Sequence, residues 1–124
     1  MSEVFRRRAL FFPHAVEQNH FGAAAFRVEG RTFAQLSRDG ATGLVKLPLG
    51  RQAWLMSEYA DACEVEPHWG RHGWTRLWLD RMPEALSCDL LGISWRLGAS
   101  RGLHAVLDRR PPDRDLAGQM SVSP

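Results

Sequence analysis

Residues 24–47 read AAFRVEGRTFAQLSRDGATGLVKL, and this stretch predicts three short β-strands separated by two turns. Apolar and polar side chains alternate along each strand, which is typical of strands that bury one face. Gly30 lies in the first turn, and Asp39-Gly40 in the second favours a hairpin because both residues tolerate a positive φ. Segments so close in sequence pair antiparallel, since a parallel pair would need a long crossover. The predicted strands are residues 24–28, 31–37 and 42–47.

Helical patterns flank these strands. Ser2 can cap a first helix that Pro13 ends, a second helix is expected over residues 49–59, and Pro83 suits the first turn of a third helix. The apolar positions are Phe5, Ala9 and Phe12 in the first helix, and Leu86, Leu90, Ile93 and Leu97 in the third. Two further strands are predicted over residues 63–66 and 74–79, and a loop over residues 14–22.

The predicted order of elements is therefore α-β(3)-α-β(2)-α. Strands that do not alternate with helices predict an α+β fold of two layers, in which the helices cover one face of an antiparallel five-stranded sheet. We expect residues 1–104 to form a single domain. Residues 105–124 carry three arginines and three aspartates among prolines and polar residues, and there we expect a flexible C-terminal tail.

The composition limits which classes of function and which compartment are expected for this protein. The chain has 16 basic and 14 acidic residues, a net charge of +2 that is too balanced to identify a nucleic-acid-binding protein. Apolar runs are too short for a membrane span, and the run after Arg6-Arg7-Arg8 is too short for a signal peptide. Two cysteines make no disulfide framework. We therefore expect a cytoplasmic protein in a reducing compartment.

Alternation also predicts what stands on the uncovered face of the sheet. The outward side chains would be Arg27, Lys46 and Arg76, interleaved with Phe33, Trp74 and Trp78. Cations interleaved with exposed aromatic rings suit a surface that pairs with phosphates and stacks on bases. The alternative is that a loop, the tail or a second subunit covers these rings, with the cations at the rim.

The loop before the last strand concentrates aromatic and basic residues among glycines. It adds Trp69 and Arg71 to the candidate binding residues, although the glycines equally suit a tight turn. His68 and His72 have the spacing of a zinc pair on a helix, but Pro67, Gly70 and Gly73 oppose a helix and no third ligand is evident. The sequence therefore predicts no metal site.

Signatures of catalysis and of cofactor binding are missing from the sequence. Glu64 and Glu66 lie two residues apart, a spacing more typical of solvated carboxylates than of a catalytic pair. Cys63 and Cys88 have no histidine partner in the sequence pattern and are interpreted as structural. We therefore expect no catalytic residue and no cofactor.

Several of these motifs, in this order, resemble the MmcQ/YjbR family of small bacterial proteins. The matching stretches are His20-Phe21-Gly22, Ala25-Phe26-Arg27-Val28 with Gly30, Phe33-Ala34, Leu44-Val45-Lys46-Leu47-Pro48, Gly73-Trp74-Thr75 and Trp95. The resemblance covers residues 3–104 and implies a secretion-chaperone-like fold, also compared with frataxin-like proteins. It implies DNA binding by fold analogy, with no established enzymatic reaction or cofactor, and it places Lys46, Gly73 and Trp74 at recurrent positions.

Two functions are carried forward. The first is a non-enzymatic binding domain whose open sheet face and Trp/His loop bind DNA, RNA or another anionic ligand. The second is a protein–protein interaction module or homodimer that buries the same aromatic face. An enzyme is the third hypothesis, and it would need a pocket with a strongly perturbed histidine or carboxylate.

Overall fold

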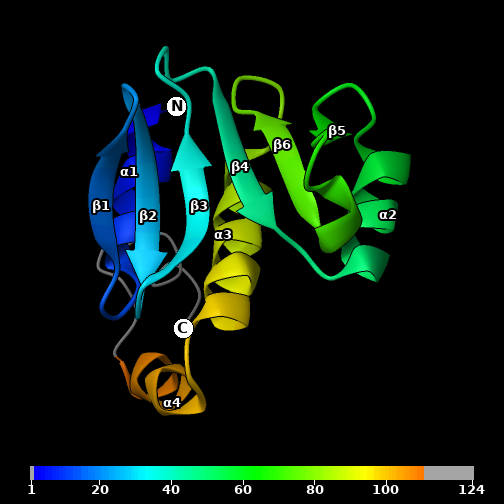
Figure 1. Cartoon of the computed structure of the whole chain (residues 1–124). Coiled ribbons are helices and arrows are strands. Elements are labelled where there is room, and N and C mark those ends of the chain that lie inside the picture. The colour runs from blue at the N-terminus through cyan, green and yellow to red at the C-terminus, as the bar shows by residue number, and fades with distance from the viewer. Residues whose placement is uncertain (1, 111–124) are drawn as a thin grey trace, which may run out of the picture.

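The computed structural model describes residues 2–110, which form four α-helices, a 3₁₀ turn and one antiparallel sheet of six strands (Figure 1). The α+β class is as predicted, while the five-stranded sheet and its element order are wrong. The helices are α1 (Ser2–Phe11), α2 (Leu49–Glu58), α3 (Glu84–Gly98) and α4 (Arg101–Arg109), and η1 (Gly70–His72) is the 3₁₀ turn. The strands are β1 (Val16–His20), β2 (Ala23–Val28), β3 (Arg31–Leu36), β4 (Thr42–Lys46), β5 (Cys63–Val65) and β6 (Trp74–Trp78), in the spatial order β1-β2-β3-β4-β6-β5.

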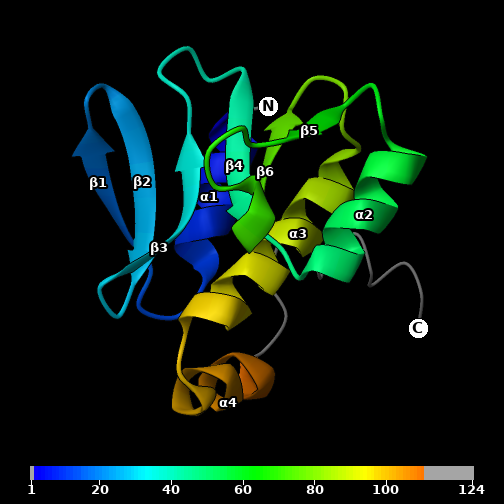
Figure 2. The same ribbon diagram turned by 45° about the vertical axis from the view of Figure 1, so that its right-hand side comes forward.

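Helices α1 and α3 lie behind the sheet in Figure 1, and the turned view of Figure 2 shows them on one side of it. Helix α2 joins the same layer, because its Gln52 amide donates to Thr75 Oγ1 at 3.1 Å, on the face of β6 that also carries buried Leu77. The core between the layers is fully buried, and each large apolar side chain there contributes about 1.5–3 kcal/mol by leaving water. Its largest members are Phe26, Phe33, Leu36, Leu77, Leu90 and Trp95.

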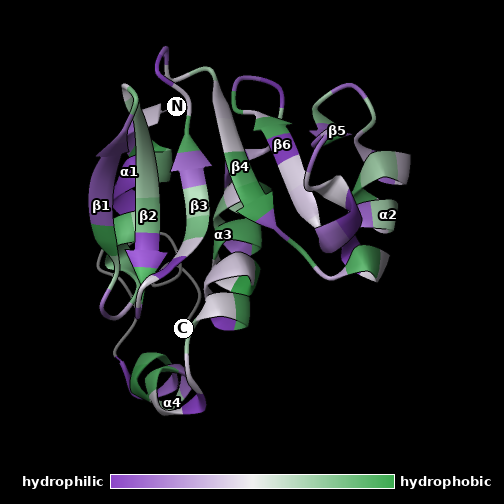
Figure 3. Cartoon of the chain, viewed as in Figure 1, coloured by the Kyte–Doolittle hydropathy of each residue, from purple (hydrophilic) through white to green (hydrophobic). Residues whose placement is uncertain are grey.

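The prediction of a loop over residues 14–22 is wrong, because Val16–His20 form the edge strand β1. All five residues are exposed, and Figure 3 shows the strand as mostly hydrophilic. No apolar alternation marks such a strand in the sequence. The antiparallel ladder with β2, which pairs Gln18 with Ala25, positions it instead.

The predicted apolar stripe of the third helix is wrong in part, since Leu90 is buried but Leu97 is 46% exposed. Ser94 turns toward the sheet instead, and buried Trp95 stacks on Phe12 at a ring distance of 5.5 Å. The Ser94 hydroxyl donates to the carbonyl of Phe33 and accepts the N–H of Lys46 at 2.8 Å, so it links α3 to β3 and β4. Small polar residues at a helix–sheet contact give no apolar signal in the sequence.

Helix α4 occupies the beginning of the segment that the sequence predicts as a tail. Ser100 caps this helix through its hydroxyl, which accepts the N–H of Leu103 at 3.4 Å, and the Leu103 side chain is buried. The rest of the predicted tail, residues 111–124, lies outside the described residues.

Candidate functional site

The candidate site lies on the face of the sheet that the described helices leave uncovered (Figure 1). Along β4 and β6, Val45 and Leu77 are fully buried against the helix layer, and their neighbours in sequence point the other way. This is the alternation that the sequence predicts for both strands. The half-buried side chains that β4 and β6 present on the uncovered face are Leu44, Lys46, Trp74, Arg76 and Trp78.

Cross-strand pairing brings cations and rings together on this face. Lys46 lies opposite Trp74, and Arg76 lies opposite Leu44. Directly opposed side chains in an antiparallel ladder have Cβ atoms about 5 Å apart, so each pair is in contact range. Within residues 2–110 the ammonium of Lys46 has no ion-pair partner, which leaves its charge available beside the Trp74 indole.

The prediction that Phe33 stands on the uncovered face is wrong. Its side chain is 1% exposed and packs edge-to-face on Phe12 at a ring distance of 6.4 Å. The Phe33 ring therefore lies in the core between the sheet and the helices. The cause is a bulge: Phe26 pairs with Ala34 but Arg27 pairs with Thr32, so Phe33 is the extra residue between them. A bulge re-aims the side chain that it inserts, and a count of odd and even positions does not detect it.

Arg27 lies on β2, at the other end of the sheet from Trp74. Its guanidinium donates to Gln18 Oε1 at 3.2 Å and to the carbonyl of Gly30. Both acceptors are neutral, so Arg27 keeps its charge while its position is fixed. The structure therefore places the predicted cations Arg27 and Arg76 on separate strands rather than in one cluster.

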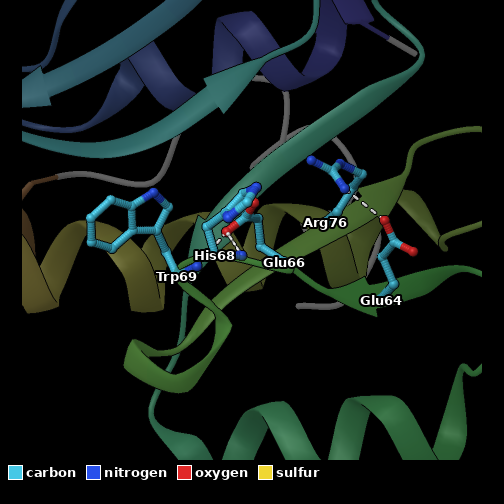
Figure 4. A network of polar contacts seen from close by, with 5 residues as sticks. All are labelled: Glu64, Glu66, His68, Trp69 and Arg76. Atoms are coloured by element: carbon cyan, nitrogen blue, oxygen red, sulfur yellow. Dashed lines mark hydrogen bonds and ion pairs between the residues drawn. The ribbon is translucent and has the colours of Figure 1, made fainter.

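Arg76 forms an ion pair that the sequence does not predict. Its Nη1 lies 2.6 Å from Glu64 Oε1, across the β5–β6 ladder (Figure 4). Both side chains remain partly exposed, so the pair adds little stability. Its electrostatic consequence is larger, because Glu64 offsets one of the positive charges on the uncovered face.

Glu66 shapes the loop that follows β5. Its side chain is only 7% exposed, and Oε2 accepts the backbone N–H of His68 at 2.9 Å and that of Trp69 at 2.5 Å (Figure 4). The interpretation as a solvated carboxylate is therefore wrong for Glu66, which is buried, whereas the Glu64 side chain is 44% exposed. The Glu66 contacts fix the start of the loop and present the Trp69 indole, which is 59% exposed.

Gly73 and Gln52 fix the end of this loop. Gly73 has φ +99°, and a Cβ on it would lie 2.0 Å from the carbonyl oxygen of Leu47, so only glycine fits the close approach to β4. Gln52 of α2 is buried and donates to the carbonyl of Gly70 at 3.1 Å. The loop is thus built onto the sheet beside Trp74.

The remaining predicted loop residues do not form a metal centre. His72 lies in η1 with its ring 6.4 Å from the Trp69 ring, and Arg71 is exposed on the same turn. Throughout residues 2–110, no three histidine, cysteine or carboxylate side chains gather in an arrangement that could hold a metal ion.

A separate hollow of about 620 Å³ lies in the helix layer between α1 and α3. Acidic and basic side chains line it together, and Cys88 forms part of its wall. Burial raises the pKa of the Cys88 thiol, and also that of Cys63 in β5. A nucleophilic cysteine needs the opposite shift, because the thiolate is the reactive form and burial disfavours it.

Comparison with known proteins places the chain in one family. The protein-family model named YjbR matches residues 10–97 of this chain. A crystal structure of a Deinococcus radiodurans protein with the DUF419 domain shares the fold, with a TM-score of 0.63 and 18% identity over 94% of this chain and 84% of that one. A comparison of this sequence with curated proteins found no match. Within residues 2–110 the helices are too short or too polar to cross a membrane. Because the family match spans most of the sequence and includes the uncovered face of β2–β4 and β6, the chain belongs to the YjbR family.

Proposed function

We propose that this protein is a non-enzymatic binding domain that binds single-stranded nucleic acid through the uncovered face of its sheet. The observation that carries the proposal is the Lys46–Trp74 pair, an ammonium with no ion-pair partner in residues 2–110 directly opposite a half-exposed indole. An aromatic face can stack on an unpaired base while a neighbouring cation binds its phosphate. Further rings are those of Trp69 in the adjoining loop and of Trp78 on β6, which has the Arg81 guanidinium 5.7 Å from its centre.

The charge balance favours single strands over duplexes. Among the cations that the sequence predicts for the site, Glu64 offsets Arg76, which leaves Lys46, Arg27 and Arg71. Three phosphate contacts predict a slope of log K against log salt of about −2 for a single strand, a weak electrostatic contribution. Stacking must then supply much of the affinity, and base faces are accessible in single strands but not in duplexes.

The absence of catalysis and the compartment are part of the proposal. Burial raises the pKa of both thiols, which argues against a cysteine nucleophile. Cys63 and Cys88 are both free, which is consistent with the proposed reducing compartment.

Protein–protein association is the second candidate, and the exposed Trp69 favours it. Tryptophan is enriched in the central contacts of protein interfaces, and Trp69 stands out from the loop beside Trp74. A second copy or another protein would then cover the uncovered face.

Fluorescence anisotropy with labelled single-stranded DNA and RNA of about 12 nucleotides tests the proposal, since comparable binding surfaces cover 4–16 nucleotides. We expect binding at low salt, a slope near −2, and weaker binding to a duplex of the same length. No binding to either single strand at low salt would refute the proposal. Light scattering that shows a tight dimer, with Trp69 and Trp74 protected from quenchers, would support the second candidate.

A further inference from the structure

Phe21 is the most exposed large apolar residue within residues 2–110, at 89% exposure. It occupies the turn between β1 and β2 with φ +53°, and Gly22 follows with φ +86°. Two consecutive positive φ values favour Asn-Gly or Asp-Gly, because a bulky side chain is strained there. A phenylalanine at this position therefore opposes folding in two ways: its positive φ strains the backbone, and its apolar ring stays in water.

The turn of the second β-hairpin also contains a residue with a positive φ, but there the side chain makes a stabilising contact. Glu29 has φ +50°, and its Oε1 accepts the N–H of Ser100 at 2.7 Å, so its side chain ties the turn to the start of α4. Phe21 has no comparable contact. Within residues 2–110 the aromatic ring that it contacts is the imidazole of His20, edge-on at 5.0 Å. Folding therefore gives no reason for a phenylalanine at this turn.

The turn that carries Phe21 is nevertheless held firmly. Asn19 Oδ1 accepts the N–H of Gly22 at 2.8 Å, and Arg38 Nη2 donates to the carbonyl of Phe21 at 3.1 Å. The Arg38 guanidinium lies so close to Gly22 that a Cβ there would be 2.2 Å from its Nε. The result is an exposed ring on a turn whose backbone is held by the Arg38 guanidinium, with the His20 imidazole beside the ring.

A shallow hollow on the uncovered face runs between this turn and the candidate site. It has a volume of about 90 Å³ and crosses β2, β3, β4 and β6, where its walls include Ala23, Ser37, Thr42 and Arg76. Ala23 pairs with His20, next to Phe21, and Thr42 pairs with Trp78. Three strand spacings of about 4.8 Å separate β2 from β6, a span of about 14 Å that suits two or three nucleotides.

We infer that Phe21 is a second base-stacking position and that a single strand crosses the sheet from Trp78 to Phe21, with a phosphate bound by Arg38. This inference rests on the proposed function. The bound strand would lie over the hollow between the two ends, where the small Ala23 and Ser37 leave room for a single group of the strand beside β2 and β3. The rings at the two ends then bind bases that are not adjacent in the strand.

The test compares Phe21→Asn with Phe21→Tyr. Asparagine suits the positive φ but removes the ring, whereas tyrosine keeps both the ring and the strain. Anisotropy with labelled single-stranded DNA and RNA of about 12 nucleotides should show a loss of about 5-fold or more for Phe21→Asn and near wild-type affinity for Phe21→Tyr. Thermal unfolding should show Phe21→Asn to be at least as stable as the wild type, so misfolding cannot explain the loss.

The outcomes separate the inference from the proposed function. Wild-type affinity in Phe21→Asn would overturn the inference and leave the proposed function intact. A wild-type protein that binds neither oligonucleotide would overturn both. A change of oligomeric state in Phe21→Asn, measured by light scattering, would assign Phe21 to a contact between copies of the chain and overturn the stacking role.

Discussion

The guanidinium of Arg76 lies 2.6 Å from the carboxylate of Glu64, its direct neighbour across the β5–β6 ladder. This pair sets the charge of the uncovered face beside Trp74 and Trp78. It also explains how a cation can stand among aromatic rings without giving the face a strong positive field.

Glu64→Gln should therefore strengthen binding of a single strand. The substitution releases Arg76 to contact a phosphate, so the slope of log K against log salt should steepen by about 0.7. Anisotropy over a salt series measures this slope. Glu58→Gln, on α2, changes the net charge equally but not the charge of this face. An equal effect of both substitutions would show that net charge, not the release of Arg76, is responsible.

Trp74→Leu should weaken binding by about 5- to 150-fold, because stacking contributes about 1–3 kcal/mol per base. Leucine keeps an apolar side chain opposite Lys46 but removes the flat ring. The matched control is Trp54→Leu, since Trp54 is an exposed indole on α2, in the helix layer. Anisotropy measures both variants. A similar loss in both would point to a general effect of tryptophan on the fold.

Gly73→Ala should destabilise the fold by about 3 kcal/mol or more, because its Cβ would overlap the Leu47 carbonyl in addition to the strain of a positive φ. Gly30→Ala is the matched comparison. Gly30 has φ +80° with open space around its Cβ position, so strain alone should cost about 1 kcal/mol. Chemical denaturation measures both. Equal losses would mean that the loop shifts readily away from β4.

The sequence predicts the central strands because their signals are local. Alternation along residues 42–47 and 74–78 and the Asp39-Gly40 turn fix which side chains of β4 and β6 face the helices, and these positions form most of the candidate site. Lys46 and Trp74 are therefore found without a structure. Their direct opposition also depends on strand order, which places β6 rather than β5 beside β4.

What the sequence does not predict depends on contacts between distant segments. The bulge at Phe33 moves a ring from one face to the other, and the Glu64–Arg76 pair depends on the β5–β6 register. The role of Phe21 is hidden for another reason: its positive φ is a backbone property, and only the following Gly22 hints at it.

The thiol of Cys63 should be slow to react with iodoacetamide. Burial raises its pKa above the ordinary value of 9.0, so the reactive thiolate is scarcer in the folded protein than in the unfolded chain. Because the pKa is raised, the protonated thiol stabilises the folded state at pH values below the ordinary pKa of 9.0. This stabilisation is lost as the pH rises through the folded-state pKa. Mass spectrometry after timed alkylation, with and without guanidinium chloride, compares the two rates. Equal rates would show that β5 opens readily.

Phe21→Asn should stabilise the protein by about 1 kcal/mol, because asparagine tolerates the left-handed region that strains phenylalanine. Removal of the ring should have little opposing effect, since Phe21 is 89% exposed and its ring contact within residues 2–110 is with His20. The melting temperature should rise by about 4 °C in thermal unfolding followed by circular dichroism. Phe21→Tyr should leave it unchanged. A lower melting temperature for Phe21→Asn would show that the ring supports the fold after all, and a structural role would then account for its presence at this turn.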